Sequence, residues 1–210
     1  MKSYVIHLIR HGAIDETLAG KYIGTTDPPL SDKGRMALRK LDYEMCYPYT
    51  QVVFTSPLKR CTETCKILYP NINPLVIANL SECNFGEWEG KTAEELKDDE
   101  DFQKWLAGDN SVKPPRGESN ADFVRRICRM FESIVEGLMK TGTTESAIVT
   151  HGGVIMTLLA VYGLPQAKPF EWAMDNGFGY SLRITPMLWQ RDKVSEVFQR
   201  IPFEREEEAE

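Results

Sequence analysis

The sequence predicts an α/β fold, a three-layer sandwich with a mostly parallel central sheet and helices on both faces. Short apolar runs of β-like composition alternate along the chain with longer segments whose apolar residues recur at helical spacing. Such alternation is typical of parallel strands joined by helices. Three of the apolar runs are also followed at once by charged or hydroxyl-bearing residues, and open α/β sheets carry their functional residues at the carboxyl ends of strands.

The predicted strands are short runs of apolar and β-branched residues. The first is apolar apart from His7 and is closely followed by Gly12, as expected of a buried strand that ends in a tight turn. His7 itself is predicted to be a packed histidine without catalytic duty. In chain order, the predicted strands cover residues 4–9, 51–55, 73–77, 146–149, 180–184 and 194–198.

The predicted helices are marked by capping residues as well as by spacing. Ser31 and Ser119 are suited to cap helices, and Ser56-Pro57 offers an N-cap followed by a first-turn proline. The helix after Ser119 is the longest, with apolar residues at helical spacing as far as Leu138. In chain order, the predicted helices cover residues 31–45, 56–69, 119–138 and 154–162.

Residues 1–203 are predicted to form one domain, because a chain of 210 residues suits a single core. Residues 92–117 interrupt the strand–helix alternation with an acidic, amphipathic stretch and then a polar, proline-bearing one. We therefore expect an excursion that caps the edge of the sheet. Residues 204–210 are predicted to be a solvated acidic tail, because like charges resist packing.

The composition excludes several classes of protein. A net charge of −6 argues against nucleic-acid binding, which requires a basic surface. No apolar run approaches the roughly 20 residues that cross a membrane, and no secretion signal is recognisable, so we expect a cytoplasmic protein without a membrane partner. The five cysteines are scattered and only three histidines accompany them, so neither a disulfide framework nor a metal site is predicted.

Four short motifs together supply the groups that phosphoryl transfer requires. They are Arg10-His11-Gly12, Ser56-Pro57-Leu58-Lys59-Arg60, Leu80-Ser81-Glu82 and Thr150-His151-Gly152-Gly153. The reaction needs a nucleophile, positive groups around the phosphate oxygens and an acid for the leaving group. The two histidines, two arginines and one glutamate of these motifs can provide all three.

These residues, in this order, resemble the histidine phosphatase superfamily, specifically its phosphoglycerate-mutase-like branch. The resemblance spans residues 4–197 and includes Tyr22-x-Gly24-x-x-Asp27-x-Pro29-Leu30-Ser31, Glu82-x-x-Phe85-Gly86-x-Trp88-Glu89-Gly90 and Pro114-Pro115-x-Gly117-Glu118-Ser119. Within the branch, the first of these stretches is most similar to α-ribazole phosphatases and small broad-range phosphatases. The resemblance implies a histidine acid-type phosphatase that acts on a small phosphorylated metabolite without a cofactor or a metal ion.

His11 is predicted to be the nucleophile, and Arg10 and Arg60 are predicted to bind phosphate. A neutral imidazole attacks phosphorus well near neutral pH because its ordinary pKa is about 6.5, so hydrolysis would proceed through a phosphohistidine. A backbone carbonyl bonded to the other ring nitrogen would fix the tautomer. The guanidinium groups match phosphate oxygens in bidentate fashion, which lysine cannot reproduce.

His151 and Glu82 complete the predicted catalytic set. His151 is expected to donate, in its protonated form, to a phosphate oxygen, while the glycines after it allow close approach. The resemblance selects Glu82 as the general acid, whereas the residues alone give no reason to prefer it over Glu87 or Glu89.

Thr17, Lys21, Tyr22 and Arg116 are predicted to contact substrate because of their positions. Relatives usually read Glu-Thr after the motif glycine and carry an asparagine three residues further on, where this chain has Ala13-Ile14 and Thr17. The asparagine usually reaches the phosphate, so Thr17 is expected to donate a shorter hydrogen bond in its place.

Two alternative functions remain. A phosphoglycerate-type mutase would need a site closed to water and more positive charge than the sequence offers, because residues 92–101 are acidic where mutases carry a basic cluster. A binding or scaffold protein on the same fold is favoured by the altered loop at residues 13–17, which could weaken catalysis.

Overall fold

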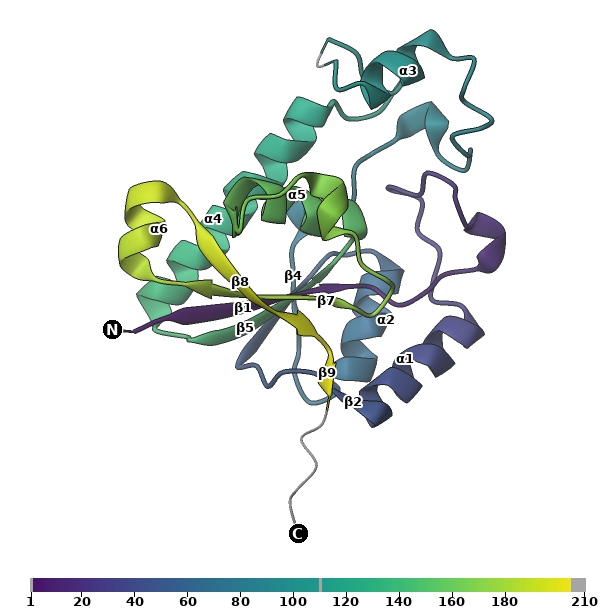
Figure 1. Cartoon of the computed structure of the whole chain (residues 1–210). Coiled ribbons are helices and arrows are strands. Elements are labelled where there is room, and N and C mark those ends of the chain that lie inside the picture. Colours follow the sequence, from purple (N-terminus) through teal and green to yellow (C-terminus); the bar gives the residue numbers. More distant parts are fainter. Residues whose placement is uncertain (1, 110, 205–210) are drawn as a thin grey trace.

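Seven strands form the central sheet of the structure, a computed structural model that describes residues 2–109 and 111–204 (Figure 1). They are β1 (Tyr4–Arg10), β3 (Val52–Thr55), β4 (Leu75–Val76), β5 (Glu145–Thr150), β6 (Gly163–Leu164), β7 (Gly179–Ile184) and β8 (Ser195–Ile201). Their order across the sheet is β4-β3-β5-β1-β7-β8-β6. Only the two pairings made by β7 are antiparallel, so the mostly parallel sheet predicted from the sequence is confirmed.

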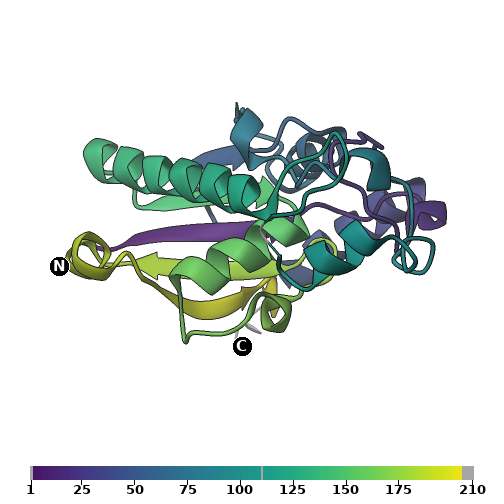
Figure 2. The same ribbon diagram turned by 90° about the horizontal axis from the view of Figure 1, so that it is seen from above.

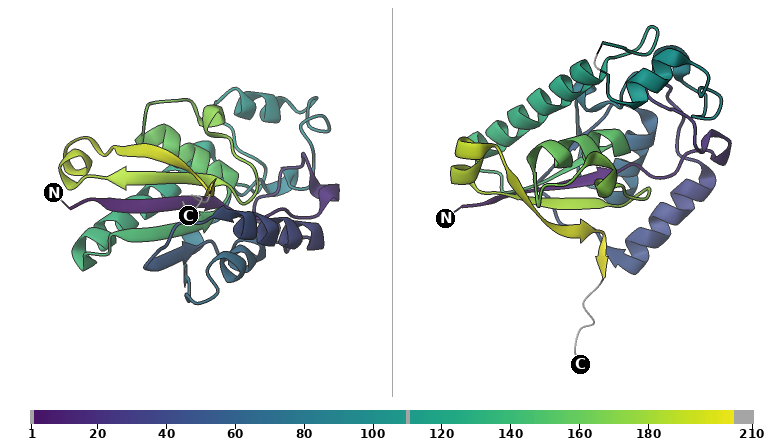
Figure 3. Two further views of the ribbon diagram at one scale, coloured as in Figure 1. Left: turned by 60° about the horizontal axis from the view of Figure 1, so that its bottom comes forward. Right: turned by 45° about the horizontal axis from the view of Figure 1, so that its top comes forward.

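Helices cover both faces of this sheet, which confirms the three-layer sandwich (Figures 1 and 2). The helices are α1 (Asp32–Glu44), α2 (Lys59–Leu68), α3 (Glu100–Leu106), α4 (Asn120–Thr141), α5 (Gly152–Tyr162) and α6 (Pro186–Asp192). Helices α4 and α5 lie on one face and α1 and α2 on the other, as the two views of Figure 3 also show. None of the described helices is long and apolar enough to cross a membrane.

The strands divide their apolar side chains between two cores, one on each face. In β1, Ile6 and Leu8 pack with α4 and α5, whereas Ile9 packs with α1 and α2. In β5, Ile148 faces the first core and Val149 the second. This alternation follows from the two-residue period of a strand, and it fixes the register in which β1 and β5 meet.

Two of the three predicted helix caps form as expected. Ser31 accepts a hydrogen bond from the backbone N–H of Gly34 at 2.9 Å, and Ser119 accepts one from Asp122 at 3.1 Å. The prediction for Ser56-Pro57 was wrong, because α2 begins at Lys59. The Ser56 hydroxyl is bonded to a histidine side chain instead, as described below.

The segment at residues 92–117 contains α3 and lies away from the sheet (Figure 1). Its Leu96, Phe102 and Trp105 form a small aromatic cluster with Tyr22, Phe85 and Trp88 from outside the segment. Trp88 and Phe102 are buried in this cluster, and an isolated β-bridge joins Thr92 to Lys21. The single domain at residues 1–203 and the capping role of this segment stay predictions.

The first residue of the predicted acidic tail, Glu204, belongs to a strand. Phe203–Glu204 forms β9, which pairs with β2 (Met45–Cys46), so backbone pairing holds Glu204 to the domain. The rest of the predicted tail lies outside the described residues.

Candidate active site

Three neighbouring parallel strands bring their motifs to one edge of the sheet. β3, β5 and β1 end side by side, and Ser56, His151 and His11 are the residues that follow their last positions. The ladder continues one residue beyond the strands, because His11 N–H donates to the Thr150 carbonyl at 3.0 Å and Ser56 N–H donates to the Val149 carbonyl at 3.1 Å. The pairing of the strands therefore sets the spacing of these side chains.

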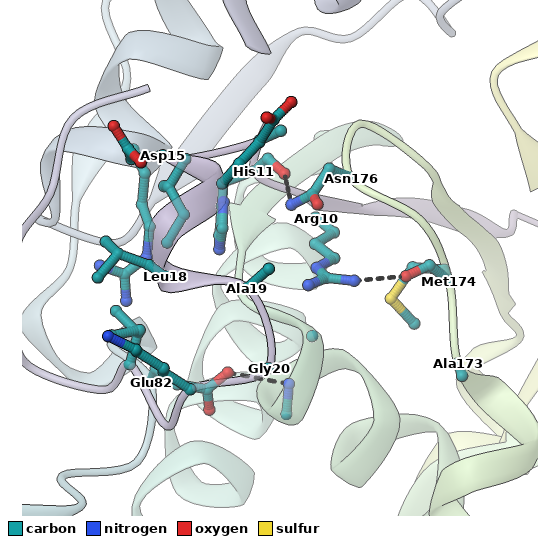
Figure 4. A pocket seen from close by; sticks show the side chains of 18 of the residues that line it. Arg10, His11, Asp15, Leu18, Ala19, Gly20, Glu82, Ala173, Met174 and Asn176 are labelled. Carbon is teal, nitrogen blue, oxygen red and sulfur yellow. Dashed lines mark hydrogen bonds between the residues drawn. The ribbon is translucent and has the colours of Figure 1, made fainter. Parts of the chain in front are cut away.

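A cavity of about 440 Å³ lies at this edge (Figure 4). The sequence-predicted residues that line it are Arg10, His11, Lys21, Arg60 and Glu82. Its mouth also carries the carboxylates of Asp15 and Glu16.

His11 is held as a neutral imidazole with one free nitrogen. Its Nδ1 lies 2.7 Å from the Gly12 carbonyl, which can only accept, so Nδ1 carries the proton. Nε2 makes no hydrogen bond with any described residue. Burial, together with the charge of Arg60, lowers the pKa of His11 to about 3. The lone pair on Nε2 is therefore available at neutral pH.

Arg60 and Arg10 are bonded to neutral acceptors only. Arg60 is 1% exposed and donates to the carbonyls of Thr26 at 2.8 Å and Gly24 at 2.7 Å. Arg10 donates to the Met174 carbonyl at 2.7 Å, and its buried Nε has no partner in the described part of the chain (Figure 4). Neither guanidinium forms an ion pair with a described carboxylate, so their charges are left for an anion.

His151 lies beside His11, with the ring centroids 5.2 Å apart, but it does not line the cavity. Arg60 Nε can only donate, so the bond of 3.2 Å to His151 Nδ1 requires that nitrogen to accept. His151 Nε2 then carries the proton and donates to Ser56 Oγ at 2.8 Å. Burial, with nearby His11, Arg60 and Arg10, lowers the pKa of His151 well below its ordinary value. The structure thus holds a neutral His151, in contrast to the protonated phosphate donor predicted from the sequence.

Glu82 is held at the first turn of α5. Its two carboxylate oxygens accept hydrogen bonds from the backbone N–H groups of Cys83 at 3.0 Å and Gly153 at 2.9 Å. Burial raises the pKa of Glu82 despite these bonds and the two arginines, which act in the opposite direction. A carboxyl group with a raised pKa is suited to donate a proton to a leaving group.

Arg126 positions the loop that carries Glu82. From α4 it binds Glu118 through two nitrogens at 2.8 Å and donates to the carbonyls of Ser81 at 3.1 Å and Glu82 at 3.4 Å. Nothing in the sequence distinguishes Arg126 from the other arginines of this helix.

Asn176 was also missed by the sequence reasoning. Its side-chain amide donates to the His11 carbonyl at 2.9 Å (Figure 4), and it reaches the site from the loop before β7. It lies 165 residues from His11, so no local pattern could have indicated the contact.

Of the four predicted substrate contacts, only Lys21 lines the cavity. Thr17 is exposed, and its hydroxyl and N–H both donate to Asp15. Tyr22 packs against Phe85 in the aromatic cluster, with ring centroids 5.1 Å apart. Arg116 has an 87% exposed side chain that pairs with Glu87 on the protein surface. The structure therefore does not bring these three residues to the site.

No group of three or more histidine, cysteine, aspartate or glutamate side chains in the described part of the chain is arranged to hold a metal ion.

A three-layer α/β fold with these groups at the carboxyl edge of its sheet defines a phosphate-processing class of protein. The chain belongs to the histidine phosphatase superfamily (branch 1), whose family profile matches residues 6–196. This membership confirms the resemblance inferred from the motifs.

Curated relatives of the chain carry phosphatase and mutase names. The chain is 29% identical to phosphoserine phosphatase 1 of Hydrogenobacter thermophilus over 80% of its own length and 81% of that protein. It is 27% identical to adenosylcobalamin/alpha-ribazole phosphatase of Salmonella typhimurium, over 81% of this chain and 85% of that protein. It is 28% identical to 2,3-bisphosphoglycerate-dependent phosphoglycerate mutase 2 of Gloeobacter violaceus, with 72% of each covered.

Solved structures show the same fold. The alpha-ribazole phosphatase from Shigella flexneri superposes with a TM-score of 0.77 at 23% identity, covering 97% of this chain and all of that one. The family and these relatives support a phosphatase enzyme, and they do not establish its substrate.

Proposed function

We propose that the protein is a phosphomonoesterase that hydrolyses a small phosphorylated metabolite through a phosphohistidine on His11. The observation that carries this proposal is the free Nε2 of a neutral His11 in one cavity with two guanidinium groups that have no carboxylate partner. A phosphate monoester supplies both an electrophilic phosphorus and the negative charge that Arg10 and Arg60 lack.

In the first step, His11 Nε2 attacks phosphorus and the bond from phosphorus to the alcohol oxygen breaks. Glu82 gives its proton to that oxygen, and the alcohol leaves. The Gly12 carbonyl, bonded to Nδ1–H, stabilises the positive charge that develops on the ring. In the second step, Glu82 takes a proton from water, the water oxygen attacks phosphorus and the nitrogen–phosphorus bond breaks. Inorganic phosphate leaves and His11 is again neutral.

Hydrolysis is favoured over the mutase reaction by the charge at the cavity mouth. A mutase must retain a doubly charged product while the phosphoryl group is returned to it. Here Lys21 is the only lysine on the lining in the described part of the chain, and it is outnumbered by Asp15 and Glu16. We therefore expect inorganic phosphate, and not a phosphoglycerate isomer, when the protein is incubated with phosphoglycerate.

His11→Ala should abolish the reaction, because no other neutral nucleophile lines the cavity. Brief incubation with substrate and a quench in base, which preserves phosphohistidine, should show one added phosphoryl group by intact mass in the wild type and none in the variant. His7→Gln is the matched control and should still be labelled. A variant that keeps more than about a tenth of wild-type turnover, a loss below ~1.4 kcal/mol, would contradict the assignment and would favour a binding or scaffold role for His11.

Activity should survive excess chelator, because Arg10 and Arg60 are assigned the charge neutralisation that a metal ion performs elsewhere. Phosphate release with and without chelator checks this expectation. Loss of turnover that a divalent cation restores would contradict it.

A further inference from the structure

A second cavity, of about 380 Å³, adjoins the first. Glu82, Gly153 and Met156 line both cavities, so the proposed general acid lies at the boundary between them. We call this second space the leaving-group cavity. Its remaining lining residues are Cys83, Phe85, Trp105, Asn120, Phe123, Val124, Thr157 and Pro169.

The lining of the leaving-group cavity is apolar and partly aromatic. Phe85 and Trp105 come from the edge of the aromatic cluster, and Phe123 and Val124 come from the first turns of α4. Among the described residues, no lysine, arginine or histidine lines this space, and Glu82 is the only one there with an ionisable carboxyl group. An alcohol that carries a carboxylate or a second phosphate would find no cation here, whereas an apolar one would remove surface from water.

Two polar side chains of this lining have no partner in the described part of the chain. The Asn120 amide makes no hydrogen bond with any other described residue, and the buried Trp105 Nε1–H makes none either, whereas the Thr157 hydroxyl donates to the Gly153 carbonyl at 2.8 Å. A lining of apolar side chains with a few unpaired polar groups is typical of a site for a small organic ligand.

We propose that the leaving-group cavity holds the ring of a ring-bearing alcohol, and that the substrate is the phosphate monoester of such an alcohol. This inference rests on the proposed function, because it takes Glu82 as the acid that protonates the leaving oxygen. That oxygen must lie beside Glu82, so the rest of the alcohol extends from the boundary of the two cavities. Arg10 and Arg60 line the first cavity but not the leaving-group cavity, so a phosphoryl group bound by them leaves the second space for the alcohol.

Two esters with the same type of leaving oxygen isolate the effect of the ring. Ethyl phosphate and 2-phenylethyl phosphate both release a primary alkoxide, so both need the same help from Glu82. Burying a phenyl ring should raise kcat/KM for 2-phenylethyl phosphate over ethyl phosphate by about tenfold or more. Phosphate release measures both rates.

Val124→Trp tests the position of the ring, because Val124 lines only the leaving-group cavity and the larger side chain would fill it. The variant should lower the preference for 2-phenylethyl phosphate to near one, while inhibition by inorganic phosphate, which needs only the first cavity, stays unchanged. Val161→Trp, on an exposed position of α5 outside both cavities, is the matched control and should keep the wild-type preference.

The outcomes separate the inference from the proposed function. A wild-type protein that hydrolyses neither ester contradicts the phosphomonoesterase itself. Hydrolysis of both esters with no preference, an unchanged preference in Val124→Trp, or a higher kcat/KM for phosphoglycolate than for 2-phenylethyl phosphate overturns the ring site alone. If Val124→Trp hydrolyses neither ester, the milder variant Val124→Met, which fills the cavity in part, is tested in its place. A reduced preference for 2-phenylethyl phosphate in Val124→Met supports the inference, and an unchanged preference overturns it.

Discussion

Each histidine at the site is held in one tautomer by a partner that can act in only one way. The Gly12 carbonyl can only accept, so it leaves a lone pair on the opposite nitrogen of His11. The Arg60 guanidinium can only donate, so it keeps His151 neutral and directs its N–H to Ser56. The two rings are neighbours, yet their partners leave a free lone pair on one and hold the other between Arg60 and Ser56.

Glu82→Gln should slow the release of poor leaving groups far more than that of good ones. An alkoxide needs a proton as it departs, whereas p-nitrophenolate does not, so we expect a loss of about 10²–10⁴-fold on an alkyl phosphate and less than about tenfold on p-nitrophenyl phosphate. Steady-state rates on the two substrates measure the difference.

The same variant has a structural control. A glutamine offers one oxygen to the two N–H groups of Cys83 and Gly153, which Glu82 now satisfies with two, so its unfolding midpoint must be measured alongside the rates. Equal losses of rate on the two substrates in a folded variant would show that another residue is the general acid.

The sequence led to the residues that we propose for the chemistry but not to the residues that hold them. The structure brings to one cavity four residues that stand at strand ends or in short motifs: Arg10, His11, Arg60 and Glu82. Arg126 and Asn176 act through contacts with residues distant in the chain. The protonation state of His151 was not predictable from the sequence either, because it depends on burial and on which atom of Arg60 faces the ring.

At the scale of elements, the two glycines that begin α5 let the helix approach the site. A Cβ on Gly153 would lie 2.5 Å from Glu82 Oε1, closer than atoms can pack, and would make a tight contact of 3.0 Å with Oε2. The obstacle is the end of a flexible side chain, so the fold can accommodate it by moving the carboxylate. The close approach of α5 at Gly153 therefore determines where the Glu82 carboxylate lies.

Gly153→Ala should reduce turnover of an alkyl phosphate by at least about tenfold, because a displaced Glu82 protonates the leaving oxygen poorly. Gly137→Ala is the matched control: this glycine lies within α4 with no atom near its would-be Cβ, so activity should be unchanged and stability should rise by up to ~1 kcal/mol. Equal activity in the two variants would show that Gly153 serves packing alone.

Most elements were predictable because local signals and tertiary structure agree. Ser31 and Ser119 cap the helices that their positions indicate. The start of α2 was misplaced because Ser56-Pro57 has the local features of a cap, whereas the tertiary bond to His151 engages the serine. Helix α6 was missed because its seven residues are too few for a helical period to stand out.

For the whole molecule, the burial of all three histidines has a consequence for acid stability. Burial lowers the pKa of His7 to about 4 and of His11 to about 3, and it lowers that of His151 well below the ordinary value. Between these values and about 6.5 the unfolded chain binds protons that the folded chain does not, so stability falls as the pH falls through this window. Glu82 and Glu145, whose pKa values are raised, oppose the effect.

We therefore expect the urea midpoint to decrease between about pH 7.5 and pH 5.5, with each neutral buried histidine contributing about 1.4 kcal/mol of the loss. His7→Gln removes one such histidine away from the site, so the variant should lose less stability over the same range. If the urea midpoint falls with pH by the same amount in the wild type and in His7→Gln, His7 is protonated in the folded state.

The order of strands in the sheet also bears on how the protein is made. β1 lies in the middle of the sheet, yet both strands that border it, β5 and β7, come after residue 144. During translation, β1 therefore leaves the ribosome long before its partners exist. Its residues Ile6, Leu8 and Ile9, fully buried in the finished sheet, are exposed in the nascent chain. The cavity that His11 lines therefore cannot form until β5 and β7 have been made.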